Sequence, residues 1–169
     1  KMENDTSDQL EVFEAAGLSV DIEEMKMIKG ILKMDVVRVR EIMKPRVDLI
    51  TIDISEKLTD VADLMSSSGY SKLPVIDQSI DNIKGIIYAK DALKIHNGTM
   101  PKIEEIIRPA IFVPESQNLE QLLSEYQDKR TRIAVVMDEH GGVSGLVTVT
   151  DLIEEIVGEL VDEFDQPDP

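Results

Sequence analysis

The residues best placed to do chemistry are Thr148 and Asp151, which flank the turn between an expected strand and an expected helix. A carboxylate can accept two hydrogen bonds from a vicinal diol such as that of ribose. A neighbouring hydroxyl can bond a sugar or a phosphate, and the start of a helix favours an anion. This Thr-x-x-Asp turn is therefore a candidate ribonucleotide site. The alternative is structural, because Asp151 could cap the helix with Glu154 at its third position.

A second turn of this kind occurs earlier in the chain, where residues 88–91 read Tyr-Ala-Lys-Asp. The aspartate is kept and tyrosine replaces threonine, so the two sites are not expected to be equivalent. Arg46 and Arg132 are candidate phosphate contacts, since each stands near a repeat boundary or the start of a strand; ordinary surface charge is the alternative for both. The predicted nucleotide-binding residues are Thr148, Asp151, Arg132, Ile133, Arg46 and Asp91.

No arrangement typical of an enzyme accompanies these turns. Catalysis needs a nucleophile with its base, a set of paired carboxylates or a metal cage. His96 and His140 are expected on exposed loops, and Gly141-Gly142 is expected to form a hairpin turn. A metal-dependent phosphohydrolase would need carboxylates that converge on one cleft, whereas most acidic residues lie in the end segments. We therefore predict that the chain is not an enzyme and has no catalytic or metal-binding residues.

An internal repeat supplies the elements that must position the two turns. Residues 41–45 (EIMKP) reappear as residues 105–109 (EIIRP), and residues 85–91 reappear as 145–151. Each copy is expected to run strand, helix, strand, strand, helix, with Ser55 or Ser116 as the cap of its first helix. The central strands are aligned with Val75 opposite Val135. The predicted fold class is α/β (α+β), with flanking helices.

The repeat also divides the chain into segments. An amphipathic helix is expected over about residues 22–34, capped by Asp21, with Met25, Ile28 and Leu32 on one face. The acidic segment after the second copy is expected to continue as a helix over residues 152–164. The predicted boundaries are a disordered or artificial lead at 1–16, a linker helix at 17–38, repeats at 39–98 and 99–157, and an acidic linker at 158–169.

Composition and charge limit the class of function. The net charge is −16, of which residues 1–24 carry −7 (eight acids, one base) and residues 151–169 carry −8 (eight acids, no base). A binder of nucleic acid needs a basic face, so that class is not expected. There is no cysteine, which excludes disulfides and thiolate metal sites. No apolar run approaches the roughly 18 residues of a membrane helix, so the chain as given is expected to be soluble.

The two copies, each ending Gly-x-x-x-x-x-Asp before a helix, resemble a pair of CBS domains, often called a Bateman module. The resemblance implies a pseudo-twofold unit that binds adenine nucleotide in clefts between the copies. The Ser/Thr-x-x-Asp signature of the family matches Thr148 and Asp151 in copy two. Copy one matches it only at Asp91.

Two longer stretches narrow the resemblance. Residues 39–46 (VREIMKPR) and 150–165 (TDLIEEIVGELVDEFD) are similar to the CorC/HlyC (hemolysin-like) and CNNM group of magnesium and cobalt transport proteins. The resemblance implies a regulatory module at the cytoplasmic face of a membrane. Its ligand would be ATP or AMP, with Mg²⁺ to screen the phosphates from so acidic a chain.

The same resemblance implies partners. It implies a homodimer, a membrane domain on the N-terminal side and a small domain on the C-terminal side. Binding would bias the dimer between conformations and so regulate transport. The alternative is a ligand-free structural dimerisation module of the same membrane protein.

Overall fold

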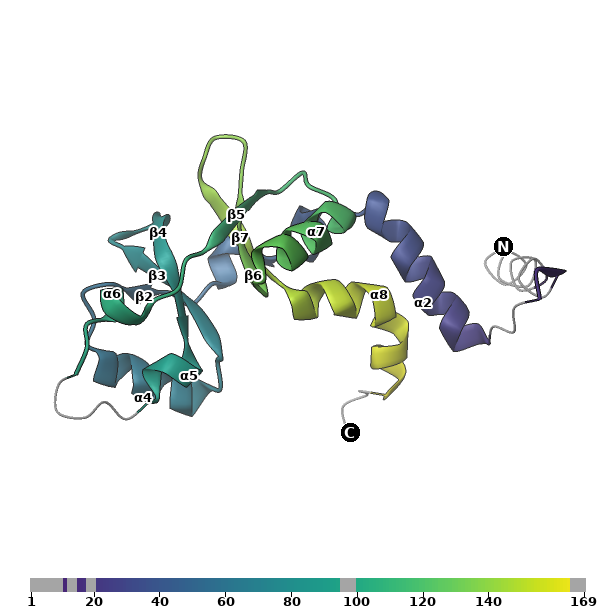
Figure 1. Ribbon diagram of the computed structural model, residues 1–169. Helices are drawn as coiled ribbons and strands as arrows, with labels where there is room; N and C mark the ends of the chain where they lie inside the picture. The colour runs from purple at the N-terminus through teal and green to yellow at the C-terminus, as the bar shows by residue number, and fades with distance from the viewer. Residues whose placement is uncertain (1–10, 12–14, 18–20, 95–99, 165–169) are drawn as a thin grey trace.

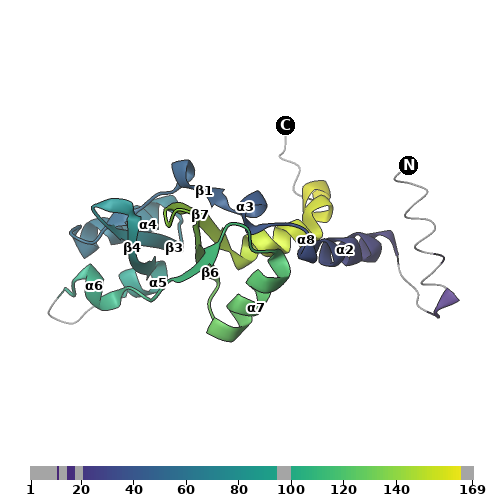
Figure 2. The same cartoon turned by 90° about the horizontal axis from the view of Figure 1, so that it is seen from above.

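The computed structural model describes residues 11, 15–17, 21–94 and 100–164 of the chain (Figure 1). The two copies form two α/β halves of an elongated molecule, which Figure 2 shows from above. Each copy has the predicted order of strand, helix, strand, strand, helix. Copy one comprises β2 (Ile52–Asp53), α4 (Leu58–Ser68), β3 (Lys72–Asp77), β4 (Ser79–Tyr88) and α5 (Ala89–Ala92). Copy two comprises β5 (Ile111–Pro114), α7 (Leu119–Lys129), β6 (Ile133–Met137), β7 (Val143–Thr148) and α8 (Val149–Phe164).

Short elements link and flank the copies. They are α2 (Ile22–Leu32), η1 (Lys33–Asp35), α3 (Val39–Ile42), β1 (Lys44–Pro45), η2 (Arg46–Asp48) and α6 (Ile103–Ile106). The described strands form a three-stranded sheet of order β2-β3-β4 and a four-stranded sheet of order β1-β7-β6-β5. In both sheets the first strand of the copy lies parallel to the middle strand, and the last strand lies antiparallel to it.

The register of the sheets corrects the alignment of the copies. Ile52 pairs with Val75 in copy one, and Val113 pairs with Val136 in copy two. Val75 therefore corresponds to Val136, and the alignment with Val135 was wrong by one residue. Runs of similar apolar residues allow such a slip in sequence, whereas the hydrogen-bonded partners of the strand do not.

The segment that precedes each copy joins the sheet of the other copy. Lys44 in β1 pairs with Leu146 of β7, and Arg108 forms an isolated antiparallel bridge with Ile86 of β4. Both crossings pass over a glycine. A Cβ atom on Gly145 would lie 2.2 Å from the Lys44 carbonyl oxygen, and one on Gly85 would lie 2.6 Å from the Arg108 carbonyl oxygen. The backbones can approach this closely only because these positions have no side chain.

The first helix of each copy begins later than expected. Ser55 and Ser116 were predicted as caps, but α4 begins at Leu58 and α7 at Leu119. Asn118 caps α7 by accepting a hydrogen bond from the Gln121 amide. The Ser55 hydroxyl instead bonds the Asp53 carboxylate at 2.7 Å, inside the loop that precedes α4. A serine before helically spaced apolar residues is compatible with a helix cap and with a loop. The local hydrogen bonds of the loop determine which of the two forms.

Aliphatic side chains fill the core, as the scarcity of aromatic residues requires. One apolar cluster lies under each sheet, and a third lies between the copies. The third cluster holds Ile86, Ile133, Val135, Val143 and Leu146, with Tyr88 packed against it. Residues from both copies therefore share a core, and the strands that end at the two turns are fixed relative to each other.

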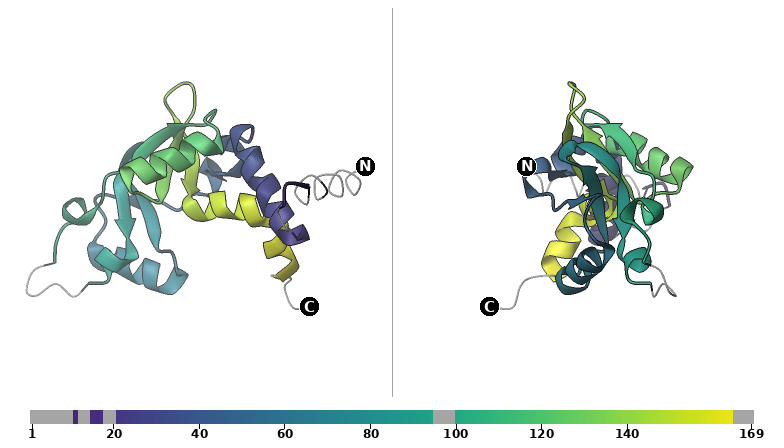
Figure 3. Two further views of the ribbon diagram at one scale, coloured as in Figure 1. Left: turned by 45° about the vertical axis from the view of Figure 1, so that its right-hand side comes forward. Right: turned by 90° about the vertical axis from the view of Figure 1, so that its left-hand side faces the viewer.

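Helices α2 and α8 lie side by side at one end of the molecule (Figure 3). The Asp21 cap is confirmed, since its carboxylate accepts a 2.7 Å hydrogen bond from the Glu24 amide. Gly30 touches α8, and a Cβ atom there would lie 2.4 Å from the Ile156 carbonyl oxygen. Met25 is buried on this face, whereas Leu32, the last residue of the helix, is 68% exposed. Within the described residues, no helix is long and apolar enough to cross a membrane.

Candidate ligand clefts

The Thr148 turn forms a reciprocal cap at the start of α8. The Thr148 hydroxyl accepts a 3.2 Å hydrogen bond from the Asp151 amide, and the Asp151 carboxylate accepts a 2.8 Å bond from the Thr148 amide. Thr148 is therefore the cap and Asp151 is the third helical residue. The expectation that Asp151 could be the cap, with Glu154 at the third position, was wrong. The cap fixes both side chains at the end of β7 and uses one oxygen of the carboxylate.

A cleft of about 330 Å³ opens beside this turn, between the two copies. Thr148, Thr150 and Asp151 line one side, and the start of β3 with the preceding loop lines the other. Apolar side chains from both copies form its walls: Leu49, Ile50, Leu73, Pro74, Ile133 and Leu146. Lys44 and Lys72 also line it. The cleft thus combines apolar walls, a carboxylate, hydroxyls and two ammonium groups.

The other predicted site residues are dispersed. Of these residues, Ile133 lines the cleft. Arg132 is exposed, and its carbonyl oxygen accepts a 2.9 Å hydrogen bond from the Val149 amide. By the register of the sheets, Arg132 corresponds to Ser71, since Ser71 makes the same bond to Ala89. Ser71 lines the copy-two cleft, so the equivalent residue Arg132 lies beside the copy-one turn instead.

Arg46 lies away from the cleft and contacts the hairpins of both copies. Its guanidinium forms an ion pair with Asp81 and donates a 3.1 Å hydrogen bond to the Val143 carbonyl. The Asp81 carboxylate also accepts a 3.0 Å bond from the Val143 amide. These bonds lower the pKa of Asp81 below its usual value. Arg46 thus ties the β3–β4 hairpin of copy one to β7 of copy two.

The Asp91 turn of copy one is closed by Arg108. The Arg108 guanidinium donates hydrogen bonds of 2.8 Å and 3.1 Å to the two oxygens of the Asp91 carboxylate. The Asp91 side chain is only 13% exposed. The hydrogen bonds from Arg108 hold the pKa of Asp91 below its usual range. Tyr88 stands where copy two has Thr148, and its ring lies 4.5 Å from the guanidinium carbon of Arg108.

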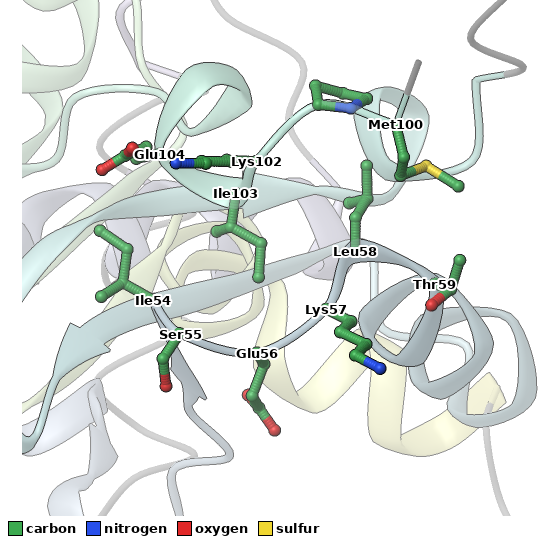
Figure 4. Close-up of a pocket in the computed structure, with 11 residues that line it drawn as sticks. Ile54, Ser55, Glu56, Lys57, Leu58, Thr59, Met100, Lys102, Ile103 and Glu104 are labelled. Atoms are coloured by element: carbon green, nitrogen blue, oxygen red, sulfur yellow. The ribbon is translucent and has the colours of Figure 1, made fainter. Parts of the chain in front are cut away.

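A larger groove, of about 590 Å³, lies at the far side of copy one (Figure 4). Ile54, Leu58 and Ile103 face it, and Met100 lies at its rim. Two of its polar side chains are engaged in the local loop: Glu56 accepts a bond from the Asp53 amide, and the Ser55 hydroxyl bonds the Asp53 carboxylate. In copy two, residues 37–39 cross the corresponding loop and bond it at Gln117 and Leu119. The groove therefore reflects a looser crossing, and none of the residues that line it belongs to the Thr148 turn or the Asp91 turn.

The remaining sequence expectations concern loops. The Gly141-Gly142 hairpin turn is confirmed, since the Asp138 amide bonds the Gly142 carbonyl at 2.8 Å. His140 is exposed in that turn, as expected, and His96 lies outside the described residues. Within the described ranges, no three side chains of histidine or acidic residues gather closely enough to hold a metal ion.

Sequence reasoning missed two kinds of contributor to the turns, the paired basic residues Lys44 and Arg108 and the buried Tyr126. Lys44 and Arg108 occupy equivalent places in the repeated EI-x-x-Pro motif, and each pairs with a strand of the other copy's sheet. The signal was present in the alignment of residues 41–45 with 105–109. Tyr126 is the other: buried in α7, it donates a 2.7 Å hydrogen bond to the Val147 carbonyl, next to Thr148. Burial raises the pKa of its hydroxyl.

The fold and the Thr-x-x-Asp turn are those of two CBS repeats joined in one unit. The comparisons with known proteins agree. The CBS domain family model matches residues 39–98 and 103–158. The chain belongs to the CBS domain family and, within it, to the CNNM/CorC group.

Three relatives carry that assignment. The magnesium and cobalt efflux protein CorC of Vibrio cholerae is 43% identical over 148 residues, which cover 86% of this chain and 51% of that protein. The CBS domain of the bacterial CNNM/CorC family Mg²⁺ transporter is 37% identical, with a TM-score of 0.81, covering 92% of this chain and 96% of that one. The same kind of domain in complex with ATP is 40% identical, with a TM-score of 0.76, covering 80% and 97%. The chain spans about half the length of the curated relatives it matches.

Proposed function

We propose that this chain is the nucleotide-sensing module of a CorC-like magnesium and cobalt transport protein. It binds one adenine nucleotide, ATP or AMP, in the cleft beside Thr148 and Asp151. The observation that carries the proposal is this open cleft, in which a carboxylate at a helix start faces apolar walls and two lysines. The complex of a related CBS domain with ATP supports the same class of ligand.

Each part of a nucleotide has a chemical counterpart in the cleft. The aliphatic walls suit an adenine ring, because they bury its faces from water. Asp151 uses one oxygen in the helix cap, and the rest of its acceptor capacity suits the ribose diol. Lys44, Lys72 and the Ser71 hydroxyl suit the phosphates. Mg²⁺ bound to those phosphates would offset the repulsion from a chain of net charge −16.

The context of the module follows from its relatives and belongs to the same proposal. The parent protein would carry a membrane domain on the N-terminal side and a small domain on the C-terminal side, with this module at the cytoplasmic face. Two modules would pair as a homodimer. Nucleotide binding would then bias the dimer between conformations, since a ligand shifts an equilibrium by its differential affinity. The module itself would perform no catalysis.

The test is thermal melting of the chain with ATP, ADP, AMP and GTP, each with and without Mg²⁺. A ligand at about 100 times its Kd stabilises the folded state by about 2.7 kcal/mol. Adenine nucleotides should raise the Tm of the unaltered chain, and Asp151→Ala should abolish the rise. Asp91→Ala is the matched control, because it removes the equivalent carboxylate of copy one and should keep the rise.

The absence of any nucleotide effect would favour the alternative function, a structural dimerisation module. If no nucleotide raises the Tm of a chain that remains folded and dimeric, the module is a structural dimerisation unit with an empty cleft. If the rise survives in Asp151→Ala and disappears in Asp91→Ala, the nucleotide binds in copy one and the proposed site is wrong.

A further inference from the structure

The two clefts receive equivalent side chains from the crossing segments. Lys44 precedes copy one and pairs with Leu146 of copy two, whereas Arg108 precedes copy two and pairs with Ile86 of copy one. The amide and the carbonyl of Arg108 are both bonded to Ile86, through two hydrogen bonds of 2.9 Å. The pseudo-twofold therefore brings one basic side chain to each strand-to-helix turn, lysine in copy two and arginine in copy one.

The two basic side chains have different partners. Arg108 reaches both oxygens of Asp91, at 2.8 Å and 3.1 Å, and stacks on Tyr88. The Lys44 ammonium lies 5.4 Å from the centre of the Tyr70 ring instead. Within the described residues, no ion pair reaches Asp151. The carboxylate of copy two thus faces an open cleft, and the equivalent carboxylate of copy one is fully engaged.

The engagement blocks the chemistry that a ribose needs. A diol must donate to carboxylate oxygens, and a planar guanidinium already donates to both oxygens of Asp91 in a two-pronged contact. Arg108 is part of the same chain, so it competes with any free ligand at a high effective concentration. Its stacking on Tyr88, the residue that replaces the threonine of copy two, fixes it further in place.

We propose that Arg108 is the residue that confines nucleotide binding to copy two. It acts as an internal occupant of the copy-one cleft, and its removal opens a second ribonucleotide site at Asp91. The inference rests on the proposed function of the Asp151 cleft.

Other cations also lie around the copy-one turn. The ammonium groups of Lys72 and Lys90 lie 5.8 Å and 5.6 Å from the centre of the Tyr88 ring. Lys94 lies 3.7 Å from the Asp91 carboxylate, on the turn that follows. Loss of Arg108 would leave both oxygens of the Asp91 carboxylate without their guanidinium donor, with the 3.7 Å contact to Lys94 remaining. The copy-one turn lacks an accessible ribose acceptor because Arg108 holds both oxygens of Asp91.

The experiment is calorimetric titration with ATP and Mg²⁺ of the unaltered chain and six variants. The unaltered chain should bind one ATP, and Asp151→Ala should bind none. The double variant Arg108→Ala/Tyr88→Thr, which copies the copy-two turn, should bind two. The triple variant, with Asp151→Ala added, should regain one, and Asp91→Asn in that triple variant should remove it again. Arg108→Lys keeps the charge but cannot hold both oxygens, so its second site should be measurable and at least about tenfold weaker than that of Arg108→Ala.

The outcomes separate this inference from the proposed function. If the unaltered chain binds one ATP that Asp151→Ala removes, while the folded double and triple variants gain nothing, the inference is overturned and the proposed function stands. It is also overturned if the unaltered chain already binds two. If the unaltered chain binds none but the triple variant binds one, the proposed function fails and the claim of confinement to copy two fails with it, while the role of Arg108 as the internal occupant at Asp91 stands. Melting curves of Arg108→Ala alone check that the fold survives the loss of the side chain.

Discussion

The strand-to-helix turns of the two copies occupy equivalent places in the repeat, but the copy-two turn faces a cleft and the copy-one turn is bonded to Arg108. Thr148 and Asp151 satisfy each other across the start of α8 and face a cleft. Tyr88 is the N-cap residue of α5 but makes no capping hydrogen bond with its side chain, and Asp91 is held by Arg108. Three exchanges between the copies, Thr148 for Tyr88, Lys44 for Arg108 and a long α8 for a short α5, separate an open site from a closed one. The repeat thus sets the scaffold, and a few side chains decide which half can bind.

The origin of the basic side chains adds a second lesson. Lys44 and Arg108 both come from the segment before one copy and reach the sheet of the other. A ligand in the copy-two cleft would therefore contact both halves at once. Arg46, which joins the hairpins of both copies through Asp81 and Val143, strengthens the same connection.

The largest difference between the copies is expected at the two glycines under the crossing segments. Gly145→Ala would place a Cβ atom 2.2 Å from the Lys44 carbonyl oxygen, inside a paired strand that cannot move freely. We expect it to lower the free energy of unfolding by about 3 kcal/mol. Gly85→Ala meets an isolated bridge at 2.6 Å and should cost about half as much. Urea unfolding of both variants measures this, and an equal or reversed order would contradict the difference in rigidity.

A smaller difference is expected below the turns, at Tyr126 of copy two and Met65, its counterpart in copy one. Tyr126→Phe removes the hydrogen bond to the buried Val147 carbonyl and should cost about 1.5 kcal/mol. Met65→Leu exchanges apolar volume and should cost less than about 1 kcal/mol. Thermal and urea unfolding of the pair check this. A Tyr126→Phe chain as stable as the unaltered one would show that the hydroxyl does not support the turn.

The reciprocal cap should be measurable on its own. Thr148→Val keeps the shape of the side chain and removes the acceptor of the Asp151 amide, which should cost about 1 kcal/mol. Tyr88→Phe removes a hydroxyl that caps no helix and should change stability by less than about 0.5 kcal/mol. Equal losses for both variants would mean that the cap of α8 contributes nothing.

The smallest effect is a pH dependence confined to copy one. Arg108 lowers the pKa of Asp91 in the folded state, so the pair stabilises the fold above the unfolded pKa of about 4. That contribution is lost as the pH falls through the lowered pKa. The unaltered chain should therefore exceed Asp91→Asn in stability at pH 7, and the gap should close below about pH 4. Unfolding curves at pH 7, 4 and 3 test the sign, and a gap that widens in acid would contradict it.

Much of this fold could be predicted from sequence because local patterns encode it. The repeat, the order of elements and the apolar faces of α4 and α7 rest on spacing along the chain, and the structure confirms them. The errors lie where two local solutions compete. Ser55 and Ser116 fit a helix start, yet the helices begin at Leu58 and Leu119. Asp151 fits a cap, yet Thr148 is the cap.

The part of the site that escaped prediction depends on contacts distant in sequence. Arg46 was a candidate phosphate contact, but Asp81 and Val143, 35 and 97 residues away, engage it. Arg132 was another, but the register of the sheets places it on the copy-one side. Nothing local to Asp91 reveals that Arg108 holds it. Only the alignment of the repeated EI-x-x-Pro motif, read together with the crossing of the sheets, links Lys44 to one cleft and Arg108 to the other.

The most direct test of the central claim is a nuclear magnetic resonance titration of the ¹⁵N-labelled, unaltered chain with ATP and Mg²⁺. The Thr148 amide donates to the same Asp151 carboxylate that we assign to the ribose, so its resonance should move most, together with those of Ser71 and Asp151. The Asp91 and Arg108 amides should stay nearly unchanged. Large shifts at Asp91 and Arg108 with an unmoved Thr148 amide would place the ligand in copy one and contradict the account.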